Sequence, residues 1–300
     1  MKDRQPVVGD SVSVLKKCIL GNKRTLYVTD LDGTLLDNGA RISDKTAAML
    51  NRLIADGAAV TVASARGVTG VGLVAGGEVD FRLPLILMNG AIFYNLDKKL
   101  VGDACVWDTE TTMKVLRICE NAGRTPFLYR VHEGQMLVEF VRLSSEGELR
   151  FFNERNVRHS GFYKQVEQYH ISDGGCVYIS MQDSAEVLAP IREKLMLLDD
   201  VDTVMYHDIY NEGNWFLEAS SARSGKGNAV SRLREQTQAE RVVVFGDNLN
   251  DMSMFEVADV RCAVENAHPD LIAAADCVIG SNDNDGVAEF IMKDYFGREE

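Results

Sequence analysis

Two carboxylates stand two residues apart in the segment DLDGT, which holds Asp30 and Asp32. The residues before it, TLYVT, form a short apolar, β-branched stretch that is typical of a buried parallel strand. Ligands of open α/β sheets bind outside the carboxyl ends of the strands, so the pair is predicted at a binding edge. Because neighbouring like charges raise one another's pKa, one carboxylate can act as a nucleophile while the other exchanges protons. Taken alone, the segment also fits a turn with solvated aspartates.

A second acidic cluster follows a second buried strand. The stretch RVVVF leads into GDNLNDMSMF, where Asp247 and Asp251 are four residues apart and Asn250 lies between them. Carboxylate oxygens are the hard ligands that Mg²⁺ prefers, and Mg²⁺ takes only a few of them because it keeps several waters. If this turn opens a helix, free backbone N–H groups would also favour an anion there. The alternative is that one of the two aspartates merely caps the helix.

Two further segments offer hydrogen-bond donors to an anion. ASARG ends the apolar stretch AAVTVAS and supplies the hydroxyl of Ser64 and the guanidinium of Arg66. SGKGN precedes the helix-like stretch NAVSRLREQ and places Lys226 between two glycines. A helix start with a solvated lysine also explains this segment, since it is not a G-x-x-x-x-G-K-[ST] phosphate loop. All four segments nevertheless fall at a strand end or the adjoining helix start, where one sheet would bring them together.

The elements that would position these residues alternate between strand and helix from Thr25 onward. A helix is predicted from its N-cap Ser43 through Asp56, with Gly57 as its stop. Further apolar strands are predicted at AAVTVAS, PLILMNG, RVVVFGD, VRCAVEN and DCVIGSN. This pattern predicts an α/β fold with a Rossmann-like parallel-sheet core.

The texture of the sequence changes between roughly Val106 and Tyr210. Stretches such as FLYRV, QMLVEF and CVYISM mix polar or charged residues with apolar ones, which is typical of an antiparallel sheet with one exposed face. We therefore predict an inserted α+β domain at 106–210, a core domain at 24–105 and 211–300, and an N-terminal extension at 1–23. The first ~20 residues and the last few, GREE, are expected to be loosely held ends.

The charge of the chain limits its partners. A formal net charge of −13 disfavours a nucleic-acid binder, because phosphate backbones are bound by clustered Lys and Arg. The six cysteines show no C-x-x-C spacing, and the apolar stretch near the N-terminus is too short and broken for a secretory signal or a membrane span. We expect a cytoplasmic protein, a monomer or homodimer, that binds neither nucleic acid nor membrane.

Taken in order, the four segments resemble the motifs of the haloacid dehalogenase-like hydrolase superfamily, and in detail those of its Cof-type phosphatases. DLDGTLL is similar to the first motif, ASARG to the second, SGKG to the third and GDNLNDMSMF to the fourth. MNGA and the tail from NAHPDLIAAADCVI through DNDGVAEFI are also similar to Cof-type segments. The family more often has Thr-Gly-Arg in its second motif, so this chain keeps the hydroxyl but not the glycine.

The resemblance implies a function and a role for each matching residue. It implies a Mg²⁺-dependent phosphatase of small phosphorylated metabolites, such as sugar phosphates, with the inserted domain as a C2-type cap that selects the substrate. It makes Asp30 the nucleophile that forms an aspartyl-phosphate, and Asp32 the general acid and base, with its backbone carbonyl on Mg²⁺. The other implied metal residues are Asp247 and Asp251. The residues expected to bind the substrate are Ser64, Arg66, Lys226 and Asn250.

Two other functions remain open on the sequence. A phosphomutase of the same superfamily shares the phosphoaspartate but returns the phosphoryl group to the sugar. A non-catalytic protein that binds phosphorylated metabolites could keep the same fold, since fold does not fix function, although the intact carboxylates argue against it.

Overall fold

A computed structural model of the protein describes residues 24–72, 77–159, 161–171, 175–208 and 211–297. The chain divides into two compact units: unit 2 is Asp103–Ser224, and unit 1 is the chain on either side of it. The expected N-terminal extension, 1–23, and residues 298–300 of the expected loose C-terminal end lie outside the described residues.

Unit 1 is built on a parallel sheet with the strand order β14-β13-β12-β1-β2. Its strands are β1 (Thr25–Thr29), β2 (Ala59–Val62), β12 (Arg241–Gly246), β13 (Val260–Val264) and β14 (Cys277–Ile279). Every residue of β1 is buried, and this strand lies between β12 and β2 in the sheet. Asp30 follows β1 directly and therefore lies at an inner position of the sheet's carboxyl edge. The Rossmann-like parallel core predicted from the sequence is confirmed.

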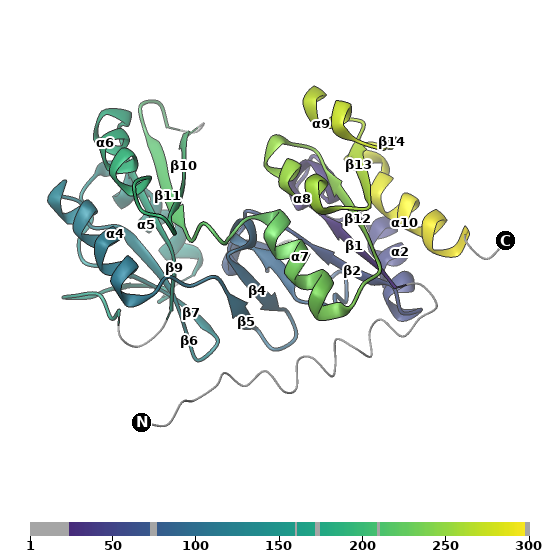
Figure 1. Cartoon of the computed structure of the whole chain (residues 1–300), viewed down its shortest axis with the longest axis horizontal. Coiled ribbons are helices and arrows are strands. Elements are labelled where there is room, and N and C mark those ends of the chain that lie inside the picture. The colour runs from purple at the N-terminus through teal and green to yellow at the C-terminus, as the bar shows by residue number, and fades with distance from the viewer. Residues whose placement is uncertain (1–23, 73–76, 160, 172–174, 209–210, 298–300) are drawn as a thin grey trace. The chain divides into compact units, whose positions relative to one another are not determined.

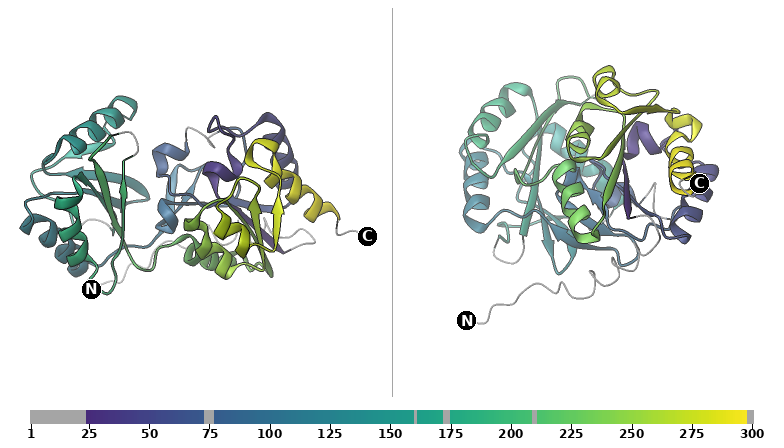
Figure 2. Two further views of the ribbon diagram at one scale, coloured as in Figure 1. Left: turned by 90° about the horizontal axis from the view of Figure 1, so that it is seen from above. Right: turned by 45° about the vertical axis from the view of Figure 1, so that its right-hand side comes forward.

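Helices cover both faces of this sheet. On one face α2 (Asp44–Ala55) packs against α10 (Gly286–Phe296), the purple and yellow helices of Figures 1 and 2. On the other face α7 (Lys226–Thr237) packs against α8 (Met252–Val257). The short helices α3 (Val68–Val71) and α9 (Pro269–Ala274) follow β2 and β13.

The start and end of α2 follow from its sequence as predicted. The side chain of Ser43 accepts a hydrogen bond from the backbone N–H of Thr46 and so caps the first turn. The chain leaves the helix through Gly57, whose φ of 103° is open only to glycine at low cost.

The predicted strand PLILMNG is not a further member of the parallel sheet. β3 (Leu85–Leu87) instead pairs antiparallel with β4 (Ile92–Asn95), in a small sheet with the order β3-β4-β5 that ends at β5 (Leu100–Ala104). One parallel bridge, between Ala63 and Ile86, joins this small sheet to the segment after β2. The turn after β3 is thereby held beside the end of β2.

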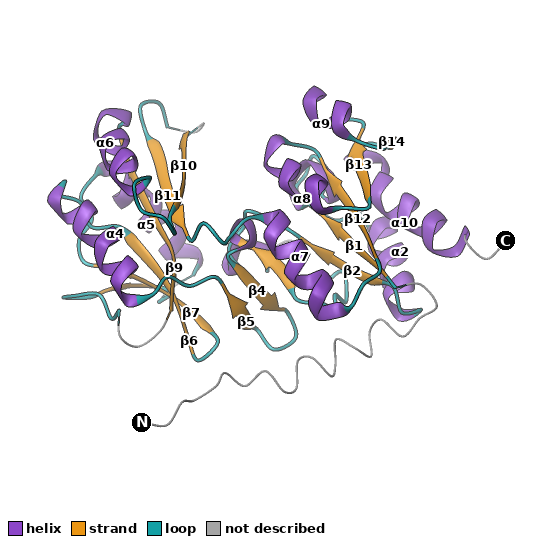
Figure 3. Cartoon of the chain, in the orientation of Figure 1, coloured by secondary structure: helices purple, strands orange, loops and turns teal. Residues whose placement is uncertain are grey.

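Unit 2 is an α+β unit around a sheet with the order β10-β11-β9-β6-β7-β8, drawn in orange in Figure 3. Its strands are β6 (Phe127–His132), β7 (Gln135–Phe140), β8 (Tyr163–Gln165), β9 (Gly175–Asp183), β10 (Asp202–His207) and β11 (Trp215–Ser220). All pairs except β7 with β8 are antiparallel. The inserted α+β fold predicted from the sequence is confirmed.

Both faces of this second sheet carry helices. Alternate residues of a strand point to opposite faces, so Leu128 joins one core and Phe127 the other. The helices α4 (Thr109–Asn121) and α6 (Ala185–Leu195) pack on the side of Leu128, and α5 (Glu146–Arg158) packs on the side of Phe127. None of the helices among the described residues is long and apolar enough to cross a membrane.

Unit 2 ends later in the chain than the insert expected at 106–210. Strand β11 pairs with both β9 and β10, so the chain returns to unit 1 only at Gly225. The stretch WFLEAS has the composition of a strand in either unit, and only its pairing partners assign it to the second sheet.

Candidate active site

The carboxyl edge of the parallel sheet gathers three of the predicted residues. Asp30 follows β1, Ser64 lies just after β2, and Asp247 follows β12. The backbone N–H of Asp30 donates to the carbonyl oxygen of Phe245 at 3.0 Å, which continues the strand pairing up to the first carboxylate. Parallel strands therefore bring together residues that are more than two hundred positions apart in the sequence.

A buried lysine joins two of the predicted carboxylates. Lys226 Nζ lies 2.6 Å from Asp30 Oδ1 and 2.6 Å from Asp251 Oδ1, and 1% of the lysine side chain is exposed. An ammonium group out of water is costly unless it is paired, and here it has two partners. The solvated lysine that the sequence left open is excluded.

Asp251 is fully buried and both its oxygens are engaged. Oδ1 accepts from Lys226, and Oδ2 accepts from the backbone N–H groups of Asp247 and Asn248 at 3.0 and 3.2 Å. The close approach requires glycine at position 246, because a Cβ there would lie 2.6 Å from Asp251 Cβ. Asp251 therefore caps the turn, as the alternative reading of the sequence had it, and also positions Lys226.

Asp247 is held by residues of the first motif. Thr34 Oγ1 donates to Asp247 Oδ1 at 2.9 Å. Gly33 has a φ of 78°, and a Cβ on it would lie 2.6 Å from Asp247 Oδ2. Asn266 Nδ2 supports this arrangement by donating to the carbonyl of Gly33 at 2.7 Å. The sequence did not predict the contacts of Thr34 and Asn266. The only sequence signal for Thr34 is its place directly after DLDG.

Three carboxylates face a single ammonium group. Asp30, Asp247 and Asp251 each offer an oxygen within 4.8 Å of the others. Burial raises the pKa of Asp30 to about 7 against the pull of Lys226, and burial also raises the pKa of Asp247. Burial lowers the pKa of Lys226, but the charges of Asp30 and Asp251 outweigh it and leave that pKa raised. The excess negative charge and the hard oxygen donors suit a divalent cation such as Mg²⁺.

Arg66 contacts the second carboxylate of the first motif. Its Nε and Nη2 donate to the two oxygens of Asp32 at 2.8 and 2.5 Å, and this bidentate bond raises the pKa of Arg66. Ser64 is buried, and its Oγ accepts from the Arg66 backbone N–H at 3.1 Å. Arg66, which is predicted to bind the substrate, therefore also orients Asp32, the carboxylate that is predicted to exchange protons.

Asn250 is the predicted site residue that the structure does not join to this cluster. It lies in the short turn η3 (Leu249–Asp251) with its side chain exposed. Within the described part of the chain, its side chain makes no hydrogen bond to the acidic cluster.

A turn with two left-handed residues connects two of the predicted binding segments. Met88 and Asn89 have φ values of 53° and 52°, which are uncommon for residues other than glycine. The N–H of Asn89 donates to the carbonyl of Ser64 at 3.0 Å, and its carbonyl accepts from the N–H of Gly225 at 2.9 Å. A Cβ on Gly90 would lie 2.3 Å from the carbonyl oxygen of Gly225. The turn therefore fixes the Ser64 segment beside the loop that leads into Lys226.

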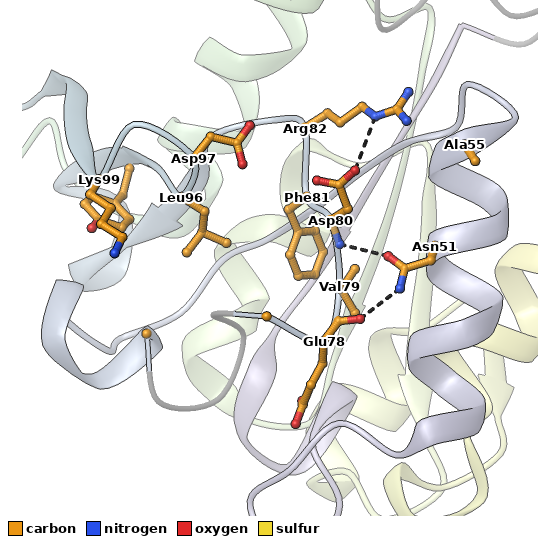
Figure 4. A pocket seen from close by; sticks show the side chains of 13 residues that line it. Asn51, Ala55, Glu78, Val79, Asp80, Phe81, Arg82, Leu96, Asp97 and Lys99 are labelled. Carbon is orange, nitrogen blue, oxygen red and sulfur yellow. Dashed lines mark hydrogen bonds and ion pairs between the residues drawn. The ribbon is translucent and has the colours of Figure 1, made fainter.

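A separate pocket of unit 1, about 630 Å³ in volume, contains none of the predicted site residues (Figure 4). It lies between α2, the segment 77–82 and the β4–β5 hairpin. Asn51 links two of its walls, because its side chain hydrogen-bonds the backbone of Glu78 and of Asp80. The predicted site residues therefore lie at the edge of the parallel sheet, apart from this pocket.

Comparisons with known proteins agree with the motifs. Residues 27–291 match the family of haloacid dehalogenase-like hydrolases. The chain is similar to 5-amino-6-(5-phospho-D-ribitylamino)uracil phosphatase YwtE of Bacillus subtilis (strain 168), with 25% identity over 292 residues, 87% of this chain and 95% of the relative. It is 27% identical to phosphatase YwpJ of the same organism over 290 residues, 89% of this chain and 98% of the relative.

Solved structures show the same fold. The crystal structure of TM0651 from Thermotoga maritima superposes with a TM-score of 0.71 at 24% identity, covering 91% of this chain and 97% of that chain. The family match spans both parts of unit 1 and the whole of unit 2, and the relatives are phosphatases, so the chain is a phosphoric monoester hydrolase. The protein belongs to the haloacid dehalogenase-like hydrolases, the family that its four motifs predict.

Proposed function

We propose that the protein is a Mg²⁺-dependent phosphatase of small phosphorylated metabolites that works through an aspartyl-phosphate on Asp30. The observation that carries the proposal is the buried contact between Asp30 and Lys226 at the carboxyl edge of the sheet. A nucleophile for a phosphate ester needs a neighbouring positive charge that offsets the charge of the phosphoryl group. The relative YwtE is named for a phosphoribityl compound, which favours a phosphomonoester of a small polyol or sugar.

The proposed reaction has two steps. First, a carboxylate oxygen of Asp30 attacks phosphorus, and the bond to the leaving oxygen breaks as Asp32 gives that oxygen a proton. Second, Asp32 takes a proton from a water molecule, which attacks phosphorus and releases inorganic phosphate and free Asp30. Ser64 and Lys226 are proposed to hold the phosphoryl oxygens. Arg66 holds both oxygens of the Asp32 carboxylate, and we propose that it releases one of them when Asp32 exchanges the proton.

The acidic cluster supports a bound divalent cation. We propose that the carboxylates of Asp30 and Asp247 and the backbone carbonyl of Asp32 hold it. Asp251 would belong to the surrounding shell, because Lys226 and two backbone N–H groups already take its oxygens. When bound, Mg²⁺ would neutralise the excess negative charge and stabilise charge on the phosphoryl oxygens.

Unit 2 is proposed to act as the cap that selects the substrate, and Asn250 to contact the substrate phosphate from its exposed turn. We also propose a cytoplasmic protein, which the cysteine pattern supports, that binds no nucleic acid, which the net charge of −13 supports. A monomer or a homodimer is proposed as its state.

The test is phosphate release from a panel of sugar phosphates and other small phosphomonoesters in the presence of Mg²⁺. Asp30→Asn removes the charged nucleophile with little change of shape, and we expect kcat to fall by at least about a thousandfold. Asp97→Asn, in the exposed β4–β5 turn, is the matched control and should keep full activity. Undiminished activity in Asp30→Asn would exclude this residue as the nucleophile.

The same assay separates the two other functions. A phosphomutase would isomerise a sugar phosphate without releasing free phosphate. A binding protein would bind a phosphorylated ligand in calorimetry but release no phosphate from any member of the panel.

A further inference from the structure

Two thiols face each other across neighbouring strands of unit 1. Cys262 of β13 is in register with Cys277 of β14, and their Sγ atoms lie 3.3 Å apart. Both are free cysteines, and neither takes part in the proposed phosphatase chemistry. Fifteen positions separate the two cysteines in the sequence, so no short spacing motif indicates that they pair.

We propose that Cys262 and Cys277 are a modification site that forms a disulfide when the folded protein meets a peroxide. Neighbouring strands lie about 4.8 Å apart, within the range of roughly 4.4–6.8 Å that Cα atoms of a disulfide span. In-register residues of paired strands also point to the same face of the sheet.

The remaining movement is small and falls on a short edge strand of the sheet. The sulfurs must close from 3.3 Å to about 2.05 Å. β14 is an edge strand of 3 residues, bonded to β13 on one side only, so it can shift toward its neighbour without breaking a second ladder.

The surroundings of the two thiols set the order of the reaction. Cys262 is fully buried, and burial raises its pKa and disfavours its thiolate, whereas Cys277 is partly exposed. Cys277 therefore loses its proton and attacks one oxygen of the peroxide; the O–O bond breaks, water leaves, and a sulfenic acid forms. Cys262 then loses its proton and attacks that sulfur, so that the S–O bond breaks and a second water leaves. The two thiols lose two electrons and the peroxide gains them.

The disulfide would close a loop that touches the active site. Between the two cysteines lie Asn266, which donates to the Gly33 carbonyl, and His268, whose backbone N–H donates to the carbonyl of Asp247 at 2.7 Å. Oxidation would therefore tie the edge strand β14 to β13, the strand that leads into the loop supporting Gly33 and Asp247.

The test is mass spectrometry of the full-length native protein after treatment with hydrogen peroxide, followed by alkylation and digestion. We expect a mass lower by two hydrogens, a peptide pair linked through Cys262 and Cys277, and reversal by dithiothreitol. Cys119→Ala, which changes another buried cysteine, should leave the linkage intact. Cys262→Ser should instead accumulate sulfenic acid at Cys277, which dimedone traps.

Two results would overturn the proposal. One is a folded wild-type protein that yields no linked peptide at a peroxide dose that oxidises other thiols. Another is a linkage that forms only after the protein has been unfolded in urea, because the native geometry would then not guide it. Neither readout depends on phosphate release, so the result is independent of the role of Asp30.

Discussion

At the scale of single residues, Lys226 is the side chain on which the site depends most. Its ammonium group is the shared partner of Asp30 and Asp251, and all three side chains are nearly or fully removed from water. The same contact orders Asp30, the proposed nucleophile, and secures the turn after β12. We therefore expect stability and activity to be linked at this residue.

Replacing Lys226 with Met should weaken both folding and activity. The substitution keeps the length of the side chain but removes the cation that two buried carboxylates share, and breaking a buried ion pair in this way costs about 3–5 kcal/mol. We expect the free energy of unfolding to fall by a few kcal/mol in urea titrations at neutral pH, and phosphate release to fall by more than about a hundredfold. Lys45→Met is the control, because Lys45 forms its ion pair with Glu289 at the surface. Equal stability of the two variants would contradict this role for Lys226.

The positions of the acidic residues could be predicted from the sequence, whereas most of their partners could not. Asp30 and Asp247 each follow an apolar stretch, and a carboxylate at the end of a buried strand is a local pattern. The bond from Arg66 to Asp32 depends on the direction in which the backbone leaves β2. The contact of Asn266 with Gly33 joins loops after different strands, and no local pattern encodes it.

At the scale of elements, the turn Met88–Gly90 illustrates how structure outside the motifs positions them. It hydrogen-bonds to the Ser64 segment on one side and to Gly225 on the other. The sequence predicts these residues as the end of the strand PLILMNG, and MNGA as a segment similar to Cof-type ones. It does not predict the turn itself, because φ above zero at Met88 runs against ordinary residue preference.

Gly90→Ala should damage the site more than the fold. Its Cβ would meet the Gly225 carbonyl at 2.3 Å, so the loop that leads into Lys226 must move. We expect kcat/KM for phosphate release to fall by about tenfold or more, as a small displacement of a positioned group typically does. Gly123→Ala is a matched control, since Gly123 also has a positive φ but its Cβ would meet nothing within 4 Å. Comparable activity losses in both variants would mean that backbone strain, and not the contact with Gly225, is responsible.

The helix α5 carries a carboxyl group whose ionisation works against the fold. Glu148 is 1% exposed, and one of its oxygens accepts from the Ser144 backbone N–H while the other has no hydrogen-bond partner among the described residues. Burial raises its pKa from 4.5 to about 7. The neutral form is thus favoured in the folded state, and its contribution to stability is full below about pH 4.5 and is lost as the pH rises through 7.

Glu148→Gln should therefore stabilise the protein only at high pH. The amide keeps an acceptor for the Ser144 N–H and carries no charge. We expect nearly equal free energies of unfolding for variant and wild type at about pH 5, and a gain of up to about 3 kcal/mol for the variant at pH 8. Urea titrations at the two pH values measure this difference, with Glu146→Gln in the exposed first turn of the same helix as the control. A pH-independent effect of Glu148→Gln would show that ionisation is not its cause.

At the scale of the whole molecule, the chain combines two units with separate cores. The change of texture near residue 106 predicted an insert, but the return near Gly225 could not be located, because β11 reads as a strand that either sheet could accept. All the carboxylates proposed to hold Mg²⁺ lie in unit 1, and both tryptophans, Trp107 and Trp215, lie in unit 2. The effect of Mg²⁺ therefore reports on unit 1, and tryptophan fluorescence reports on unit 2.

Mg²⁺ should stabilise unit 1 selectively. A ligand that binds only the folded state adds about 2.7 kcal/mol at a concentration one hundred times its Kd, and here it would also relieve the repulsion among the three carboxylates. We expect Mg²⁺ to slow hydrogen exchange in peptides of β1 and β12 and to raise their unfolding midpoint, while the tryptophan fluorescence midpoint of unit 2 changes little. Asp247→Asn should abolish the shift in unit 1, since it removes one proposed ligand and keeps an acceptor for Thr34. An equal shift of the tryptophan signal would contradict separate unfolding of the units, and a shift retained in Asp247→Asn would place the cation elsewhere.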